Sequence, residues 1–293
     1  MSEKTFRAGS VFLLALTAAI FPALRFGVFA AVGVFALVMG VGLVFSFASV
    51  WRRERIVHTP FPEAQRAILL KDVEAYRSLS AADRARFEGE VAIFLAEQNI
   101  AGLRGEPVDE ELRVLVAASA TNIAFGRPGF RYPTTRDVVV YEGSFDESYR
   151  VGAEAKEGAP ILGMVHGSGP ILFSAQALRQ GFRNAHDALN VGLHEFAHVL
   201  DFEAGHANGI PSFMPWGAVR PWLHVMHAET TRIHRHQSIL RDYAGTNDAE
   251  FFAVATEMFF EQPERMKDKH AELYALMVTT YGQDPAAKGG HVS

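Results

Sequence analysis

The feature that most constrains this chain is a long uncharged stretch near its N-terminus. Residues 26–51 contain no Asp, Glu, Lys, Arg or His. A helix of that length would extend roughly 39 Å at ~1.5 Å per residue, enough to cross a hydrocarbon core about 30 Å thick. A buried core helix is the alternative, but apolar runs this long are typical of membrane spans. We therefore expect a transmembrane helix over residues 26–51.

A shorter apolar run precedes it over residues 10–24. This run fits either the first limb of a helical hairpin or the core of a cleaved leader peptide. Lys4 and Arg7 come before the two runs, and the arginine-rich stretch 52–55 follows them. Positive charge favours the cytoplasmic side, and a hairpin would place both flanks there. Residues 1–57 are thus expected to anchor the chain, by one or two spans, in a bacterial-type inner membrane, with the catalytic domain facing the cytoplasm.

The rest of the chain has the composition of one soluble domain. Residues 58–62 contain two prolines and are expected to form a linker, because proline interrupts a helix. Residues 63–285 suffice for a single globular domain, and residues 286–293 form a short tail. The chain has no cysteine, which excludes disulfides and thiolate metal sites. A net charge of −5 without a dense basic stripe argues against nucleic-acid binding.

Periodicity in the soluble part predicts an α+β fold that is mainly helical with a small β-sheet. Ser80 and Asn247 are expected to cap helices, because each is followed three residues later by an acidic residue. The run 170–174 is expected to be an edge strand, along which an extended peptide could pair. Helices are expected over 63–79, 80–99, 109–125, about 219–241, 247–262 and about 271–281, and strands over 137–141 and 170–174.

The stretch NVGLHEFAHVLD contains the pattern His-Glu-x-x-His at His194, Glu195 and His198. On a helix, His194, His198 and Asp201 share one face, while apolar residues occupy the opposite face. Two imidazoles one turn apart can bind a single Zn²⁺, and a glutamate beside them can take a proton from water. The alternative is a core helix that carries three hydrogen-bonded polar residues. The motif by itself is a hypothesis.

A catalytic zinc needs a third protein ligand. The downstream candidates are Asp201, His206, the histidines of 224–236, Glu250 and Glu257. The helix that carries the two glutamates is apolar on nearly every side, and a buried carboxylate is costly without a cation or metal nearby. These two residues are separated by ~10.5 Å along the helix, so one ion cannot bind both. At least one of them is expected to be functional, whereas the irregular histidines of 224–236 fit a solvated face.

Several motifs, in the same order, resemble the Mlc titration factor A family of zinc peptidases. They include LNVGLHEFAHVLD, YAGTNDAEFFAVATEMFFEQP and ELYALMVTTYGQDP, and the likeness extends from about Pro60 to Pro285. This family is of the gluzincin type. The resemblance therefore implies a zincin-like metallopeptidase domain, here preceded by one or two transmembrane helices.

Carried over by position, the resemblance implies a role for each residue of the site. His194, His198 and Glu250 would be the metal ligands, and Glu195 the general base. Tyr243 would stabilise the oxyanion or protonate the leaving amine.

Ligating histidines usually need an outer hydrogen-bond partner to orient them. Asp201 is expected to orient one of the histidines in this way. Glu257 lies too deep in its helix to share the ion, and is expected to orient His194 or His198 or to pair with a basic group.

Together these features predict a membrane-anchored zinc metallopeptidase that uses a zinc-activated water and a glutamate general base. Its expected partners are a peptide or protein substrate and the lipid bilayer. The alternative is a regulatory binding protein, which would sequester a protein partner through a peptidase-like fold with little turnover. Glu195 favours the enzyme, because a protein that only binds would not need a general base.

Overall fold

The computed structural model describes residues 12, 14–18, 20, 27–103, 107–132, 137–143, 163–165 and 169–287. The chain divides into two compact units, Met1–Pro60 and Phe61–Ser293, here called the N-terminal and C-terminal units. The described residues are mostly helical with one small mixed sheet, which confirms the expected mainly helical α+β class.

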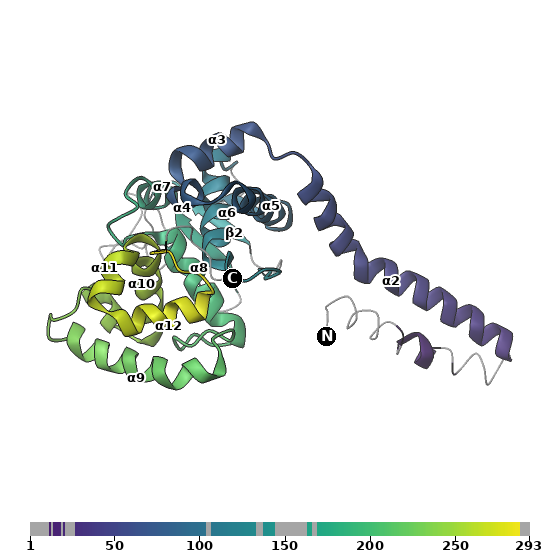
Figure 1. Ribbon diagram of the computed structural model, residues 1–293. Helices are drawn as coiled ribbons and strands as arrows, with labels where there is room; N and C mark the ends of the chain where they lie inside the picture. The colour runs from purple at the N-terminus through teal and green to yellow at the C-terminus, as the bar shows by residue number, and fades with distance from the viewer. Residues whose placement is uncertain are drawn as a thin grey trace. The chain divides into compact units, whose positions relative to one another are not determined.

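The main element of the N-terminal unit is helix α2, Val28–His58 (Figure 1). With 31 residues and a mean hydropathy of 2.6, it is the one helix among the described residues that is long and apolar enough to cross a membrane. That finding rests on length and composition only. The helix ends at His58, just before Pro60, as the prolines of the linker predict.

The expected first limb, residues 10–24, lies partly outside the described residues. Its described members, residues 12, 14–18 and 20, are helical. The ring of Phe12 lies 5.6 Å from the ring of Phe35 in α2, so the two apolar runs are in contact within the N-terminal unit.

The C-terminal unit begins with four helices. Residues 63–79 were expected to form one helix, and this prediction is wrong, because Val73 has φ −107° and ψ 97°, outside the helical region. Val73 and Tyr76 are both buried, so packing of these side chains overrides the local helical pattern. The predicted cap is confirmed, since the Ser80 side chain accepts a hydrogen bond from the Asp83 N–H. The helices are α3 (Glu63–Asp72), α4 (Glu74–Ser78), α5 (Ala81–Glu97) and α6 (Glu110–Ala124).

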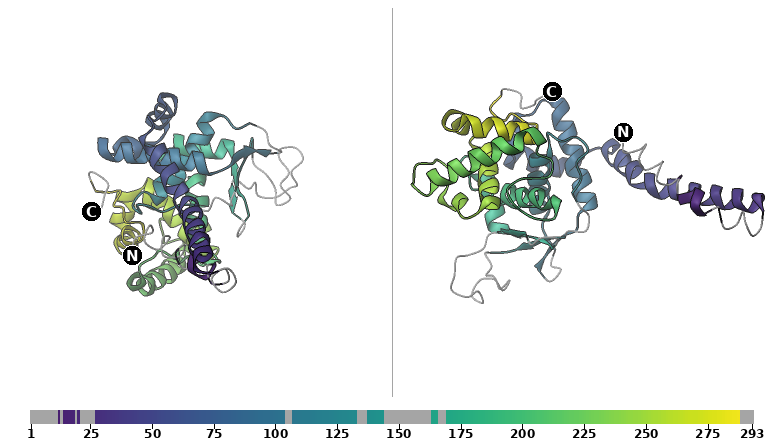
Figure 2. Two further views of the ribbon diagram at one scale, coloured as in Figure 1. Left: turned by 90° about the vertical axis from the view of Figure 1, so that its right-hand side faces the viewer. Right: turned by 90° about the horizontal axis from the view of Figure 1, so that it is seen from below.

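A four-stranded sheet lies beside these helices (Figure 2). Its strand order is β1-β2-β4-β3, with β1, β2 and β4 parallel and β3 antiparallel to β4. The expectation that the run 170–174 forms an edge strand is therefore wrong, because β4 lies between β2 and β3. The strand beyond β4 is β3, which the sequence does not predict because a run of three residues is too short to show a strand pattern. The strands are β1 (Ile100–Gly102), β2 (Val138–Tyr141), β3 (Gly163–Val165) and β4 (Ile171–Ser174).

The remaining elements are helical. The expected helix 219–241 is shorter at its C-terminal end than predicted, because α9 stops at Ile233 and His236 adopts a left-handed φ of 54°. The predicted Asn247 cap is confirmed, since its Oδ1 accepts a 2.9 Å hydrogen bond from the Glu250 N–H. The elements are α7 (Ala175–Arg183), α8 (Val191–Asp201), η3 (Phe202–Ala204), α9 (Trp216–Ile233), η4 (Asp242–Gly245), α10 (Asp248–Glu261), α11 (Pro263–Lys269) and α12 (Ala271–Tyr281).

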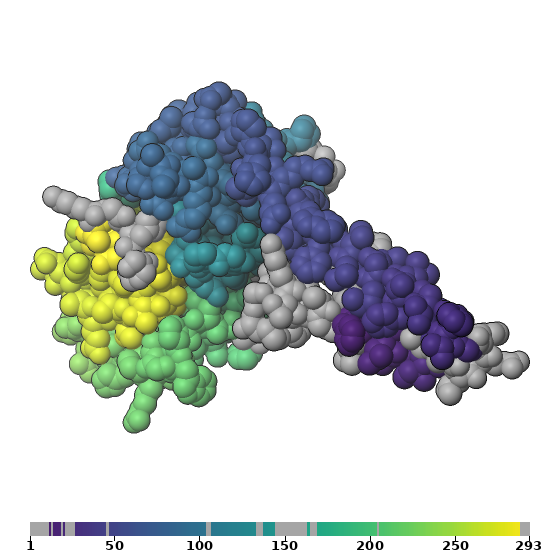
Figure 3. All heavy atoms as spheres, turned by 45° about the vertical axis from the view of Figure 1, so that its right-hand side comes forward, coloured from purple at the N-terminus to yellow at the C-terminus, as the bar shows by residue number. Residues whose placement is uncertain are grey.

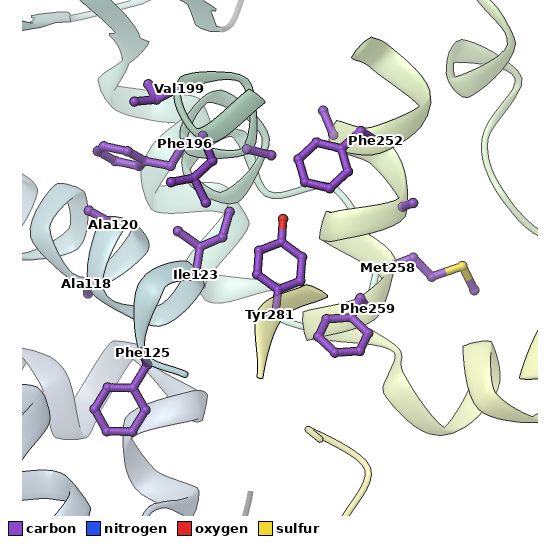
Figure 4. Packing of buried hydrophobic residues seen from close by; sticks show 14 of the residues in the cluster. Ala118, Ala120, Ile123, Phe125, Phe196, Val199, Phe252, Met258, Phe259 and Tyr281 are labelled. Carbon is purple, nitrogen blue, oxygen red and sulfur yellow. The ribbon is translucent and has the colours of Figure 1, made fainter. Parts of the chain in front are cut away.

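The core of the C-terminal unit is packed between α6, α8, α10 and α12. In Figure 4, Ile123 of α6 and Phe196 of α8 face the aromatic side chains of α10, with Tyr281 between them. The Tyr281 hydroxyl lies 2.7 Å from Thr256 Oγ1, so this buried phenol has a hydrogen-bond partner. Segments from the start (blue), middle (teal and green) and end (yellow) of the unit pack against one another (Figure 3).

Close approach of α8 to α6 depends on one glycine. A Cβ at Gly192 would lie 2.1 Å from Ser119 Oγ, far inside van der Waals contact. Only glycine at this position lets α8 lie so near α6. The buried contact fixes the helix that carries the His-Glu-x-x-His pattern.

Candidate metal centre and active site

Helix α8 places its two histidines one turn apart on the same face. The Nε2 atoms of His194 and His198 are 3.2 Å apart, and the rings are nearly perpendicular at 82°. Both side chains are largely buried, with 12% and 11% of their surface exposed. The two Nε2 atoms therefore converge on one point, as the helical spacing predicts.

Helix α10 packs against α8 and brings a carboxylate to the same point. Glu250 Oε2 lies 3.0 Å from His194 Nε2 and 3.4 Å from His198 Nε2. This oxygen is buried and accepts no well-directed hydrogen bond from the described residues. Among the residues that the structure describes, His194, His198 and Glu250 are the one group of His, Cys, Asp or Glu that could hold a metal ion.

The three donors fit a tetrahedral cation. Ligand atoms bound to Zn²⁺ at about 2.0–2.1 Å in tetrahedral geometry lie about 3.3 Å apart, and the three separations here are 3.0, 3.2 and 3.4 Å. Burial raises the pKa of Glu250, but its contacts with His194 and His198 lower it more, to well below the usual value. A carboxylate that stays ionised beside two imidazoles is a suitable donor set for a divalent cation.

Glu257, two turns after Glu250 in α10, contacts the other ring nitrogen of His194. Its Oε1 lies 2.8 Å from His194 Nδ1, and its Oε2 accepts a 2.7 Å hydrogen bond from the Asn190 N–H. Arg241 also donates to Oε1 and compensates the charge of a residue that is only 2% exposed. An acceptor at Nδ1 fixes the ring tautomer and leaves the Nε2 lone pair for a metal. Arg241 and Asn190 were missed in the sequence, where no pattern links either residue to Glu257.

Glu195 lies buried next to the cluster, with 4% of its surface exposed. Its Oε2 has no hydrogen-bond partner among the described residues. Burial raises the pKa of Glu195 to about 7, against the opposing charges of His194 and His198. Burial thus disfavours the ionised form of this carboxyl group, and a raised pKa suits a group that both accepts and donates a proton.

Tyr243 of η4 lies beside the cluster. Its ring centroid is 6.1 Å from that of His194, and half of its surface is exposed. Burial and the neighbouring Glu250 raise the pKa of Tyr243 to about 12, so the hydroxyl keeps its proton at neutral pH. The residue can therefore act as a hydrogen-bond donor.

Asp201 and the other histidines lie outside this cluster. In place of the expected bond to a histidine, Asp201 Oδ2 accepts a 2.8 Å hydrogen bond from the Gly209 N–H, among the described residues. Asp201 thus attaches the loop after α8 to the end of that helix. The candidates His206, His224, His227, His234 and His236 are all exposed.

The sequence is similar to several known bacterial proteins. An uncharacterized protein of Synechocystis sp. is 26% identical over 247 residues, which cover 80% of this chain and 89% of that protein. Mlc titration factor A of Salmonella arizonae is 27% identical over 228 residues, 72% of this chain and 88% of the relative. Mlc titration factor A of Serratia proteamaculans is 33% identical over 145 residues, 43% and 55% of the two chains.

The glucose-regulated metallo-peptidase M90 family matches residues 48–282, a segment that contains every residue of the cluster. The match agrees with the resemblance that the motifs predict. This chain belongs to the glucose-regulated metallo-peptidase M90 family.

Proposed function

We propose that this chain is a membrane-anchored zinc metallopeptidase that hydrolyses peptide bonds. The observation that carries the proposal is the convergence of His194 Nε2, His198 Nε2 and Glu250 Oε2 at mutual distances of 3.0–3.4 Å, beside the buried Glu195. Membership of a metallopeptidase family supports it.

His194, His198 and Glu250 would hold the ion, and Glu257 and Arg241 would keep the first histidine in place. A zinc ion in such a site supplies Lewis-acid polarisation of the scissile carbonyl and a lowered pKa for the attacking water. Glu195 would take a proton from the attacking water and pass it to the leaving nitrogen. Its pKa of about 7 supports both transfers.

Tyr243 and β3 would complete the substrate site. The Tyr243 hydroxyl, protonated at neutral pH, donates a hydrogen bond to the oxygen on which negative charge develops. An extended peptide would pair with β3, which is the outermost strand on its side of the sheet among the described residues and whose Gly163 lies directly against Glu195. This edge replaces the one expected at residues 170–174.

The N-terminal segment would hold the enzyme at the bacterial inner membrane. The length and hydropathy of α2 support a span, and the arginines that follow Trp51 support a cytoplasmic peptidase domain. The proposed organisation is an anchor over 1–57, a linker over 58–62, a peptidase domain over 63–285 and a tail over 286–293.

The experiment that tests the proposal compares two variants of the full chain. Glu195→Gln should lower peptide hydrolysis by about 10²–10⁴-fold, because it removes the general base, while zinc content stays at the wild-type level. His194→Ala should lose both zinc and activity. Zinc analysis and cleavage of a peptide library measure both outcomes. A Glu195→Gln protein that cleaves peptides at the wild-type rate would refute the assigned role.

A second function, sequestration of a regulatory protein, is favoured by the name of the relatives, Mlc titration factor A. In that case the fold binds a partner and turnover is slow or absent. The same pair of proteins separates the two functions. A wild-type protein that carries zinc but cleaves no peptide faster than Glu195→Gln would favour the binding protein.

A further inference from the structure

The C-terminal unit contains a cavity of about 490 Å³ that the proposed peptidase function does not use. Asn190 and Leu193 of α8 line it together with Glu261 of α10, but none of the five proposed catalytic or metal-binding residues does. Its volume lies within the range of small-molecule sites in proteins. The cavity is therefore large enough for a ligand of its own.

The charged side chains that line this cavity are acidic. Asp72, Glu74, Glu261 and Glu264 contribute to its wall, and no lysine or arginine among the described residues does. Two of these acids have partners, since Asp72 pairs with Lys71 at 3.4 Å and Glu74 lies 3.2 Å from His186 Nε2. The rest of the wall is largely apolar, with Leu79, Phe87, Phe125, Phe182, Leu193 and Phe260.

Glu261 is the most confined of these acids, with 7% of its surface exposed. Its Oε1 accepts a 2.9 Å hydrogen bond from Asn190 Nδ2, and its Oε2 has no hydrogen-bond partner among the described residues. Burial raises the pKa of Glu261 to about 8, and the charges of Glu257 and Asp187 add to this shift. Without a cation this carboxyl group is therefore mostly protonated at neutral pH, and a positive group beside Oε2 would stabilise its ionised form.

The carboxylates are arranged for an organic cation rather than a metal ion. Metal coordination needs several donor atoms within a few ångströms of one another, and among the described residues only the His194, His198 and Glu250 group meets that condition. The aromatic wall can contact an aliphatic stem, and aromatic faces also attract ammonium and guanidinium groups.

We propose that this cavity binds an organic cation, an ammonium or guanidinium group on an aliphatic stem, with its charge at Glu261 and its stem against the apolar wall. A free diamine and a lysine or arginine side chain of a polypeptide share this chemistry.

Calorimetric titration of the purified full chain with cadaverine tests the proposal. Cadaverine should bind to the wild type and at least tenfold more weakly to Glu261→Gln, whose amide keeps the acceptor for Asn190 but carries no charge. The matched control is Glu272→Gln, the same substitution at an exposed position outside the cavity, which should bind as the wild type does. The uncharged analogue 1,5-pentanediol and the anion glutarate should not compete.

Ala185 lines the same cavity, so Ala185→Trp should occlude it and lower the cadaverine affinity at least tenfold, even if Glu261→Gln does not fold. Titration with N-acetyl-lysine-methylamide distinguishes the two sources. Binding of this compound as well as cadaverine assigns the site to a polypeptide side chain, and binding of cadaverine alone assigns it to a free amine.

Three results would overturn the proposal: no cadaverine binding at millimolar concentration, equal binding to Glu261→Gln, or equal binding of 1,5-pentanediol. Because the titration measures binding and not hydrolysis, it is independent of the peptidase proposal. The Glu195→Gln protein should bind cadaverine as the wild type does.

Discussion

At the scale of single residues, two glutamates on one helix have different surroundings. Glu250, at the third position of α10, lies 3.0 Å from His194 Nε2, on the side where a metal would bind. Glu257, two turns later, lies 2.8 Å from His194 Nδ1 on the other side of the same ring. In the proposed function, Glu250 shares the ion with this ring, and Glu257 holds the ring in position.

Glu250→Gln and Glu257→Gln should therefore differ in metal affinity. Loss of a charged ligand in Glu250→Gln should lower zinc affinity by more than about 100-fold, whereas loss of an orienting partner typically costs about 10–100-fold. The two substitutions are chemically identical, so each is the control for the other. Competition with a chelator, followed by metal analysis, ranks the two proteins. A larger loss of zinc in Glu257→Gln would reverse the two roles.

A third carboxylate, Glu88 of α5, connects helices α3, α4 and α5 away from the metal cluster. It accepts hydrogen bonds from Arg66 Nε at 2.8 Å, Arg66 Nη2 at 3.1 Å and the Tyr76 hydroxyl at 2.6 Å. Glu88→Gln should lower the free energy of unfolding by about 1–3 kcal/mol, because charge-assisted hydrogen bonds become neutral ones. Chemical denaturation at neutral pH measures the difference, with the exposed Glu272→Gln as the control.

The pH dependence of this difference has a defined sign. The hydrogen bond from Arg66 lowers the pKa of Glu88, so the folded state binds a proton less readily than the unfolded state. The stabilisation is complete above the ordinary glutamate pKa of about 4.3 and is lost as pH falls through the lowered folded value. The difference in unfolding free energy between the wild type and Glu88→Gln should thus become smaller below about pH 4. If this difference in unfolding free energy becomes larger on acidification, Glu88 is not an ionised hydrogen-bond acceptor in the folded state.

At the scale of secondary-structure elements, the contact between β3 and α8 controls the position of Glu195. A Cβ at Gly163 would lie 2.5 Å from Glu195 Oε1 and 2.6 Å from Val191 Cγ2. Since real Cβ atoms do not approach so closely, a larger residue in β3 must displace either the strand or the glutamate. The close packing of β3 against the proposed general base therefore depends on the absence of a side chain at Gly163.

Gly163→Ala should lower the rate of peptide hydrolysis by about 10–100-fold, because small displacements of a catalytic group have effects of this size. The zinc content should remain that of the wild type, since the three atoms nearest to a Cβ at Gly163 belong to Glu195 and Val191 and not to the proposed ligands. Gly217→Ala is the matched control, because a Cβ there meets nothing within 4 Å. Steady-state kinetics together with metal analysis measure both quantities. Wild-type activity in Gly163→Ala would exclude the positioning role.

At the scale of the whole molecule, the two units differ in their expected solvent. The N-terminal unit contains an apolar 31-residue helix, and the most hydrophobic part of this helix is not buried among the described residues. The C-terminal unit, in contrast, has an extensive hydrophobic core of its own. An exposed apolar helix is unstable in water, and a lipid bilayer would solvate it.

A reporter fused after Thr59 should therefore show cytoplasmic activity, and the full chain should remain in the membrane pellet after alkaline extraction. Replacing Arg52, Arg53 and Arg55 by glutamine should weaken the preference of the C-terminal unit for the cytoplasmic side of the membrane, because it removes the positive charge that follows the span. Protease protection in spheroplasts measures the side on which the C-terminal unit lies. Periplasmic reporter activity with a shortened chain would indicate a cleaved leader instead.

The sequence by itself determined the features that depend on near neighbours along the chain. Helix caps at Ser80 and Asn247 follow from residues three positions apart, and the shared face of His194 and His198 follows from the helical period. The apolar N-terminal helix and the mainly helical class likewise follow from local composition. Each of these interactions closes within a turn or two of helix, so local patterns are sufficient to predict them.

Only the tertiary structure decided the contacts between residues far apart in the sequence. The contact of Glu257 with His194, 63 residues away, and its ion pair with Arg241 require α8, α10 and η4 to pack together. Three predictions from the sequence were wrong because they depend on tertiary packing. Asp201 bonds to Gly209 and not to a histidine, the helix predicted over 63–79 breaks at Val73, and β4 lies inside the sheet and not at its edge. The free energies of burial and of strand pairing depend on which elements pack against each other, and no local pattern in a single sequence specifies those contacts.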